Sequence, residues 1–310
     1  MASIKPTHLE RTATEPREKS LHTVTLSEIK QVNDQVRLFR LALAAPIRFL
    51  PGQWVDLFIP GISKAGGYTI TSSPSKAFPS PSGGAQSSCT SACYLELAVQ
   101  KSSDPPAAWL WQDADAIIFA ELQIRIGGSF VWPPPGINIR SLRRVVFVAG
   151  GVGINPLMSM LSSLAENPDE ECCPFEVRFL YSLKQDTATG SSAIGPRTER
   201  LLFLDRLGSI FGSGKVKGEL QLFLTNGREE EDQEGVVSCG TKKANSVPFC
   251  RRRMTVGDVA AAIGNASERR FAVVYICGVP TMTDEFVQTL TELKHGLRIE
   301  PHHVLCEKWW

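Results

Sequence analysis

The sequence predicts two domains, an antiparallel β-barrel followed by an α/β domain with a mostly parallel sheet. Three observations lead to this prediction. The chain has 310 residues, more than one hydrophobic core usually organises. Up to about residue 137, short apolar segments alternate with turn-forming residues. From residue 143 onward, strand-like apolar runs alternate with helical patterns instead.

The barrel is predicted over residues 21–137, behind a flexible N-terminal segment, 1–20. In Trp54–Ile59, the apolar residues Val55, Leu57 and Ile59 share one face, as a half-buried strand requires. Further strand candidates are Arg37–Leu43, Tyr94–Val99 and Ala116–Ile126. Many short strands without long helices are typical of a small antiparallel barrel. Ser75–Ala92, rich in Ser, Pro and Gly, predicts a mobile hairpin loop, and Pro133–Gly136 predicts a stiff linker.

The second domain is predicted over residues 143–310. Val145–Ala149 is a continuous apolar run, which is typical of a strand buried on both faces. Further strands are predicted at Phe175–Tyr181, Leu220–Thr225 and Phe271–Ile276, and helices at Thr198–Ile210, Thr255–Ile263 and Thr281–Leu293. Residues 228–253 carry an acidic run and a basic run, and predict a solvated insertion loop. The alternation favours a Rossmann-like parallel sheet with helices on both faces.

Residues 145–156, VVFVAGGVGINP, lead from a strand through a glycine turn into a helix. Glycine lets the backbone turn sharply and lets a phosphate approach without a β-carbon in the way. The helix points N–H groups and its positive dipole end at that phosphate, and a proline suits its first turn. A tight turn without a ligand is the alternative. The predicted diphosphate site consists of Gly150, Gly151, Val152, Gly153, Ile154, Asn155 and Pro156.

A second glycine turn follows the strand candidate at Tyr275–Ile276. Cys277 and Gly278 lie at the carboxyl end of this strand, before a helix. Ligands of open α/β sheets bind at that edge. We therefore expect Cys277 to lie beside the ligand as a small, polarizable side chain, with simple core packing as the alternative.

Composition argues against several other classes. The net charge is +1, so no global field attracts nucleic acid. The sequence contains no apolar run of about eighteen residues, the length that would predict a membrane span. The eight cysteines show no C-x-x-C spacing, and His302 and His303 lack partners at ligand spacing, so no metal site is expected.

The two glycine turns, preceded by a barrel, resemble the ferredoxin–NADP reductase family. In that family the barrel binds flavin and the following domain binds NAD(P)H. Further residues that carry the resemblance are Gly52–Asp56, Pro105–Ala107, Met282–Asp284 and Glu307–Trp310. The resemblance favours a mitochondrial location, with the cytosol as the alternative, because the N-terminal residues are partly acidic.

For the barrel, the resemblance implies an R-x-Y-S/T strand on which Arg binds flavin phosphate, Tyr stacks on the ring and Ser/Thr bonds its reactive edge. Tyr68 and Thr69 match this motif, but Gly66 replaces the arginine. The family's G-x-x-S element corresponds to Asp104–Leu110, where Ala107 replaces the serine and two prolines remove N–H donors. FAD is thus a less certain cofactor than NAD or NADP.

The resemblance implies that hydride passes from NAD(P)H to the flavin and that electrons continue to an unknown acceptor. Thr69 and Cys277 are the residues expected nearest the chemistry. Tyr181 and Ser182 follow a strand where family members contact the adenosine, and Trp310 ends the chain where relatives place an aromatic residue near the flavin. The alternative function is an NAD(P)-binding sensor or scaffold that has lost the flavin and its redox activity.

Overall fold

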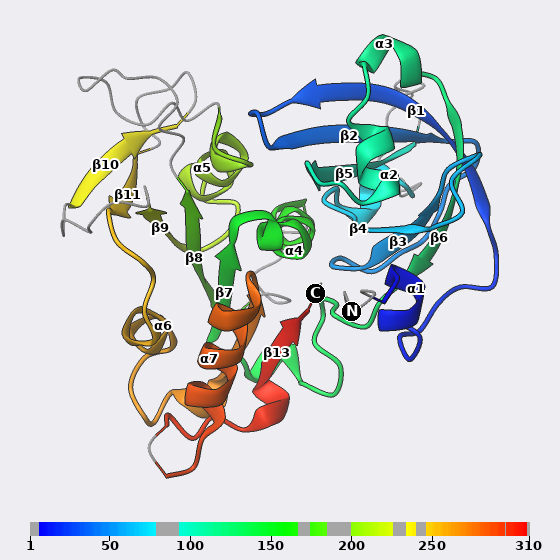
Figure 1. Ribbon diagram of the computed structural model, residues 1–310. Coiled ribbons are helices and arrows are strands. Elements are labelled where there is room, and N and C mark those ends of the chain that lie inside the picture. The colour runs from blue at the N-terminus through cyan, green and yellow to red at the C-terminus, as the bar shows by residue number, and fades with distance from the viewer. Residues whose placement is uncertain are drawn as a thin grey trace, which may run out of the picture. The chain divides into compact units, whose positions relative to one another are not determined.

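The computed structural model describes residues 6–78, 93–166, 174–184, 200–225, 234–239, 246–294 and 296–308. The chain forms two compact units, and Figure 1 colours the ribbon from blue at the N-terminus to red at the C-terminus. Unit 1 comprises Met1–Trp132 with Met158–Ser163, and unit 2 comprises Pro133–Leu157 with Leu164–Trp310.

Unit 1 is built on an antiparallel, barrel-like sheet with the strand order β4-β3-β6-β1-β2-β5. Its strands are β1 (His22–Gln31), β2 (Val36–Leu43), β3 (Trp54–Phe58), β4 (Gly66–Thr69), β5 (Tyr94–Gln100) and β6 (Glu121–Gly127). Ile70 forms an isolated bridge with Leu97, which brings the two edge strands together just beyond β4. Alternate residues such as Val55 and Leu57 fill the interior. The predicted antiparallel barrel is confirmed.

The first part of the strand predicted at Ala116–Ile126 is helical. Helix α3 covers Ala114–Ile117, and β6 begins only at Glu121. Asp113 caps the helix by accepting a hydrogen bond from the Asp115 amide, and Phe119 adopts a left-handed backbone (φ 65°) that separates helix from strand. Of the predicted loop Ser75–Ala92, the structure shows a 3₁₀ turn at Pro74–Lys76, and residues 79–92 lie outside the described ones.

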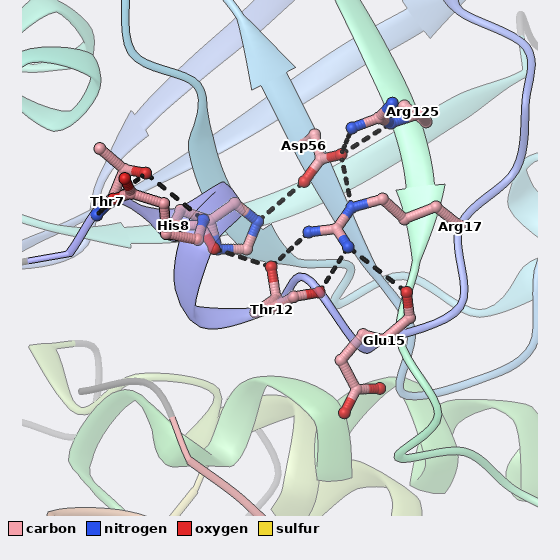
Figure 2. A network of polar contacts seen from close by, with 8 residues as sticks. Thr7, His8, Thr12, Glu15, Arg17, Asp56 and Arg125 are labelled. Atoms are coloured by element: carbon pink, nitrogen blue, oxygen red, sulfur yellow. Dashed lines mark hydrogen bonds and ion pairs between the residues drawn. The ribbon is translucent and has the colours of Figure 1, made fainter.

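The N-terminal segment, predicted to be flexible, contains helix α1 (His8–Arg11) and contacts the barrel through a buried carboxylate. Asp56 of β3 is fully buried, and its oxygens lie 2.8 Å from His8 Nε2 and 3.1 Å from Arg17 Nε (Figure 2). Arg125 of β6 donates two further bonds to Oδ2, at 2.8 and 2.6 Å. A β-carbon at Gly67 would collide with the His8 ring, so glycine at this position makes room for the segment.

Unit 2 is built on a sheet with the strand order β10-β11-β9-β8-β7-β12-β13. Its strands are β7 (Arg144–Gly150), β8 (Glu176–Lys184), β9 (Gly218–Thr225), β10 (Glu234–Ser238), β11 (Ser246–Cys250), β12 (Ala272–Cys277) and β13 (Val304–Glu307). Neighbouring strands are parallel except for the pair β10 and β11. The predicted, mostly parallel sheet is confirmed.

Unit 2 contains the two ends of helix α4 (Ile154–Glu166) and the helices α5 (Leu204–Gly212), α6 (Val256–Ile263) and α7 (Pro280–Thr291). Helices α6 and α7 lie on the same side of the sheet in Figure 1, where Val259 and Phe286 pack with Val146 and Ile276. Consecutive residues of β7, from Val145 to Ala149, are buried, so this strand is covered on both faces and reads as a continuous apolar run in the sequence.

The loop predicted at residues 228–253 contains structure, so this prediction was wrong. Strands β10 and β11 pair antiparallel, and β11 pairs in parallel with β9. Val237 and Val247 are buried in this extension of the sheet. The two charged runs made the whole segment look like a solvated loop in the sequence, although each short strand alternates buried with more exposed residues.

Candidate functional site

The candidate site of unit 2 lies where the strand order reverses. From β7 the chain continues outward through β8 and β9, and β12 then pairs with the other side of β7. The turns that follow β7 and β12 are therefore neighbours at the carboxyl edge of the sheet. In an open α/β sheet, this switch point is where ligands bind.

The two turns touch through their backbones. A β-carbon at Gly153 would lie 2.5 Å from the carbonyl carbon of Cys277 and 2.7 Å from the amide nitrogen of Gly278. A β-carbon at Gly150 would lie 3.3 Å from the Cα of Gly278. A side chain at Gly153 would collide with the backbone of the second turn, and one at Gly150 would fit only tightly against it.

Gly151 is the exception, since a β-carbon there would meet nothing within 4 Å. Its backbone is left-handed (φ 55°), a conformation that glycine adopts freely. A 3₁₀ turn, Gly151–Gly153, leads from it into the thirteen-residue helix α4, with Pro156 in the first turn. An open backbone at a helix amino end suits an anion, so these residues fit the diphosphate of a dinucleotide.

The other residues predicted for this site differ in exposure. Val152 is half-buried, whereas Ile154 and Asn155 are buried. Ser182 is half-buried and pairs in register with Gly150, which places it at the same sheet edge. Tyr181 is buried, and burial raises the pKa of its phenol, so its side chain belongs to the core. Trp310 lies outside the described residues.

Cys277 occupies the predicted position at the end of β12, but its side chain is only 1% exposed. Burial raises the pKa of this thiol well above its ordinary value, and the charges of Glu307 and Cys306 act in the same direction. The thiol is therefore neutral and enclosed. A role for Cys277 beside a ligand stays a prediction.

We expect Cys277 to resist alkylation by iodoacetamide at pH 7 in the folded protein, because the thiolate is the reactive form. Cys306, half-buried on the neighbouring strand, is the internal comparison. Peptide mass spectrometry over a time course should show Cys306 modified first. Modification of Cys277 at the same rate or faster would show that the thiol is open to solvent.

Met282 completes the site, although sequence reasoning assigns it no role of its own. A β-carbon at Gly150 would lie 3.1 Å from its Cε and 3.3 Å from its Sδ, and its methyl group also contacts Gly278. The side chain starts from the first turn of α7 and points back toward the helix amino end, as helical side chains do. Its flexible thioether thus covers the contact between the two glycine turns.

The residues predicted to hold a flavin lie in unit 1, on β4 and α2 (Pro105–Leu110). Thr69 is buried and Tyr68 is half-buried. The Tyr68 ring lies over Gly66, in the position where the side chain of an arginine would begin. The residues present do not fit a flavin dinucleotide, because the phosphate-binding cation is missing and its space is filled.

Within the part of the chain that the structure describes, no helix is long and apolar enough to cross a membrane. The same residues contain no group of three or more His, Cys, Asp and Glu side chains placed to hold a metal ion.

Solved structures that match nearly the whole of this chain show which fold it has. A ferredoxin NADP⁺ reductase from Neisseria gonorrhoeae, with bound FAD and NADP, has a TM-score of 0.60 at 16% identity, covering 94% of this chain and 99% of that chain. A cytochrome P450 reductase from Amycolatopsis has a TM-score of 0.62 at 20% identity, covering 95% of this chain and 70% of that chain. The fold is that of the ferredoxin–NADP reductases.

Sequence comparison gives a narrower assignment. No protein-family model matches the chain. Oxidoreductase NAD-binding domain-containing protein 1 of Xenopus laevis is 30% identical over 324 residues, covering 100% of this chain and 86% of that protein. The protein of the same name from Danio rerio is 29% identical over 308 residues, covering 98% of this chain and 97% of that protein. The chain belongs to the family of these proteins.

Proposed function

We propose that the chain is an NAD(P)H-dependent oxidoreductase whose unit 2 binds the nicotinamide dinucleotide. The observation that carries this proposal is the backbone contact between the turns after β7 and β12, at the switch point of the sheet. The names of the relatives, which include an NAD-binding domain, support it. So does the shared fold with a reductase that contains NADP.

When bound, a reduced nicotinamide supplies a hydride, that is, two electrons and a proton. The chain has to bind and orient it. Gly151 and the start of α4 receive the diphosphate, while Gly150 and Gly278 let the two turns approach each other beneath the Met282 side chain. Hydride transfer needs correct distance and a dry environment, and no acid or base is required. The electron acceptor is an unidentified protein or small molecule.

The resemblance also implies a barrel-bound flavin as the first acceptor. The proposed transfer does not pass through such a flavin, because Gly66 replaces the phosphate-binding arginine and the Tyr68 ring lies where its side chain would begin. Isothermal titration calorimetry of the full chain with NADH and with NADPH tests the nucleotide site. We expect saturable, one-to-one binding of at least one of them, and the comparison assigns NAD or NADP. A folded sample that binds neither contradicts the proposed function.

Gly151→Ala separates binding from folding. Because position 151 has open space but a left-handed backbone, the variant should lose only about 1 kcal/mol of stability. Its added methyl group lies where the diphosphate approaches, so affinity for NADH should fall by about tenfold or more. Thermal unfolding and calorimetry on the same sample measure the two effects. Unchanged affinity would show that the diphosphate does not approach Gly151.

The second candidate function is a sensor or scaffold that binds NAD(P) without redox activity. The packing of Tyr68 on Gly66 favours it, because it removes the electron carrier that the resemblance implies. Steady-state oxidation of NADH with ferricyanide or a quinone as acceptor distinguishes the two functions. Turnover whose KM for NADH rises in Gly151→Ala supports the oxidoreductase, and binding without turnover supports the sensor.

A further inference from the structure

The notch between β4 and α2, formed by Gly66, Tyr68 and Pro106, is closed by its own side chains. A β-carbon at Gly66 would lie 2.5 Å from Cε2 and 2.9 Å from Cζ of Tyr68. The same point lies 2.9 Å from the Cβ of Pro106. The tyrosine ring thus packs directly on the glycine backbone, and the proline borders the same space. No side chain longer than a hydrogen atom can start from position 66 without moving the ring.

The charges around the notch disfavour an anion. Burial raises the pKa of the Tyr68 phenol, and the negative charge of Asp104 raises it further. Asp104 directly precedes α2, so the acid lies where the family's short helix would meet a diphosphate. A flavin diphosphate placed here would face this carboxylate. The arginine that binds the diphosphate in the family is missing.

The backbone of α2 offers little compensation. The helix is six residues long and begins with Pro105 and Pro106, neither of which has an N–H to donate. Each charge-assisted phosphate contact that is lost weakens binding by roughly one to two orders of magnitude. The missing charge, the missing N–H donors and the filled space all weaken the binding of a flavin at this notch.

We propose that the barrel of this protein is a flavin-free module in which the Tyr68 ring occupies the space that the family gives to an arginine and its phosphate. The barrel retains its fold because the ring, Gly66 and Pro106 pack together where a cofactor would otherwise be needed to fill the notch. This inference concerns unit 1 and does not depend on nucleotide binding by unit 2. It implies that electrons from NAD(P)H leave by an acceptor other than a flavin resident in the barrel.

The first test is the visible spectrum of the full chain, purified without added cofactor and then titrated with FAD. We expect no absorption band at about 450 nm, where oxidised flavins absorb. We also expect no saturable change in FAD fluorescence up to about 100 µM, a range that covers any specific cofactor site. Cooperative thermal unfolding of the same sample shows that it is folded. A yellow protein, or saturable FAD binding within this range, overturns the inference.

The second test examines the packing itself with a double-mutant cycle. Gly66→Ala should lower the melting temperature by about 5 °C, because its methyl group collides with the Tyr68 ring. In a Tyr68→Ala background the same substitution should cost less than half as much, since the ring that comes nearest to the added methyl group is gone. An equal loss in both backgrounds contradicts the proposed packing.

The matched control is Gly257→Ala in α6, where a β-carbon would meet only the Thr255 hydroxyl, at 3.4 Å. Alanine favours a helix over glycine, so this variant should melt at the same temperature or higher. It separates the collision at Gly66 from any general effect of replacing glycine. Because the FAD titration reports on unit 1 and NADH calorimetry on unit 2, failure of this inference is distinguishable from failure of the proposed function.

Discussion

Gly153→Ala is expected to abolish NADH binding and to destabilise unit 2 by about 3 kcal/mol. The added methyl group would collide with the carbonyl carbon of Cys277 and the amide nitrogen of Gly278. Both are backbone atoms at the end of a central strand, so neither can rotate away as a side chain would. The collision forces the two turns apart, and with them the surface that receives the diphosphate. Urea unfolding and NADH calorimetry measure the two losses.

Two comparisons make this result interpretable. Gly257→Ala in α6 should keep both stability and NADH affinity, because its methyl group has room. Gly151→Ala should lose affinity with little loss of stability, because its position is open. If Gly153→Ala binds NADH like the unmodified protein, the contact between the turns does not define the nucleotide site, and the proposed function loses its main support.

The glycine turn after β7 could be predicted from sequence because its constraints are local. An apolar strand, three glycines within four residues and a proline in the next helical turn are all visible in residues 145–156. The contact of Gly153 with Cys277 was not predictable, because it joins residues far apart in the chain. The same holds for Met282, whose position depends on how α7 starts relative to β7.

The departures from prediction arise where long-range packing overrides composition. The charged segment 228–253 contains β10 and β11 because β9 offers β11 an edge to pair with. At Gly66, the sequence shows that an arginine is missing. Only the structure shows that the Tyr68 ring fills the space, and this turns a missing contact into a closed notch.

Asp56→Ala is expected to destabilise unit 1 by about 3 kcal/mol, because removing one member of a buried ion pair leaves its partners without a counter-charge. Asp56 is fully buried and contacts His8, Arg17 and Arg125, which come from the N-terminal segment and from β6 (Figure 2). Deleting residues 1–20 should have a comparable effect, since it removes His8 and Arg17. Of the three partners, Asp56 then keeps only Arg125. A deletion that leaves stability unchanged would show that the segment is the flexible extension predicted from sequence.

The exposed pair between Glu18 and His22 provides the control for Asp56. Both side chains are partly exposed, so Glu18→Ala should cost less than about 1 kcal/mol. Urea unfolding at pH 7 compares the two variants under identical conditions. Equal losses for Asp56→Ala and Glu18→Ala would mean that burial adds nothing to the Asp56 network.

Acid should weaken the Asp56 network in a defined pH window. Burial alone would raise the pKa of this carboxyl, but hydrogen bonds from His8, Arg125 and Arg17 outweigh burial and hold the pKa below its ordinary value of 3.8. A carboxyl with a lowered pKa in the folded state stabilises the protein fully above its unfolded-state pKa and loses that contribution as the pH falls through the folded-state pKa. The unmodified protein should therefore lose stability more steeply than Asp56→Asn as the pH falls below about 4. Urea unfolding from about pH 5 to about pH 3 measures both slopes, because a carboxyl group titrates within this range. Parallel slopes would mean that His8, Arg17 and Arg125 do not hold Asp56 as a carboxylate.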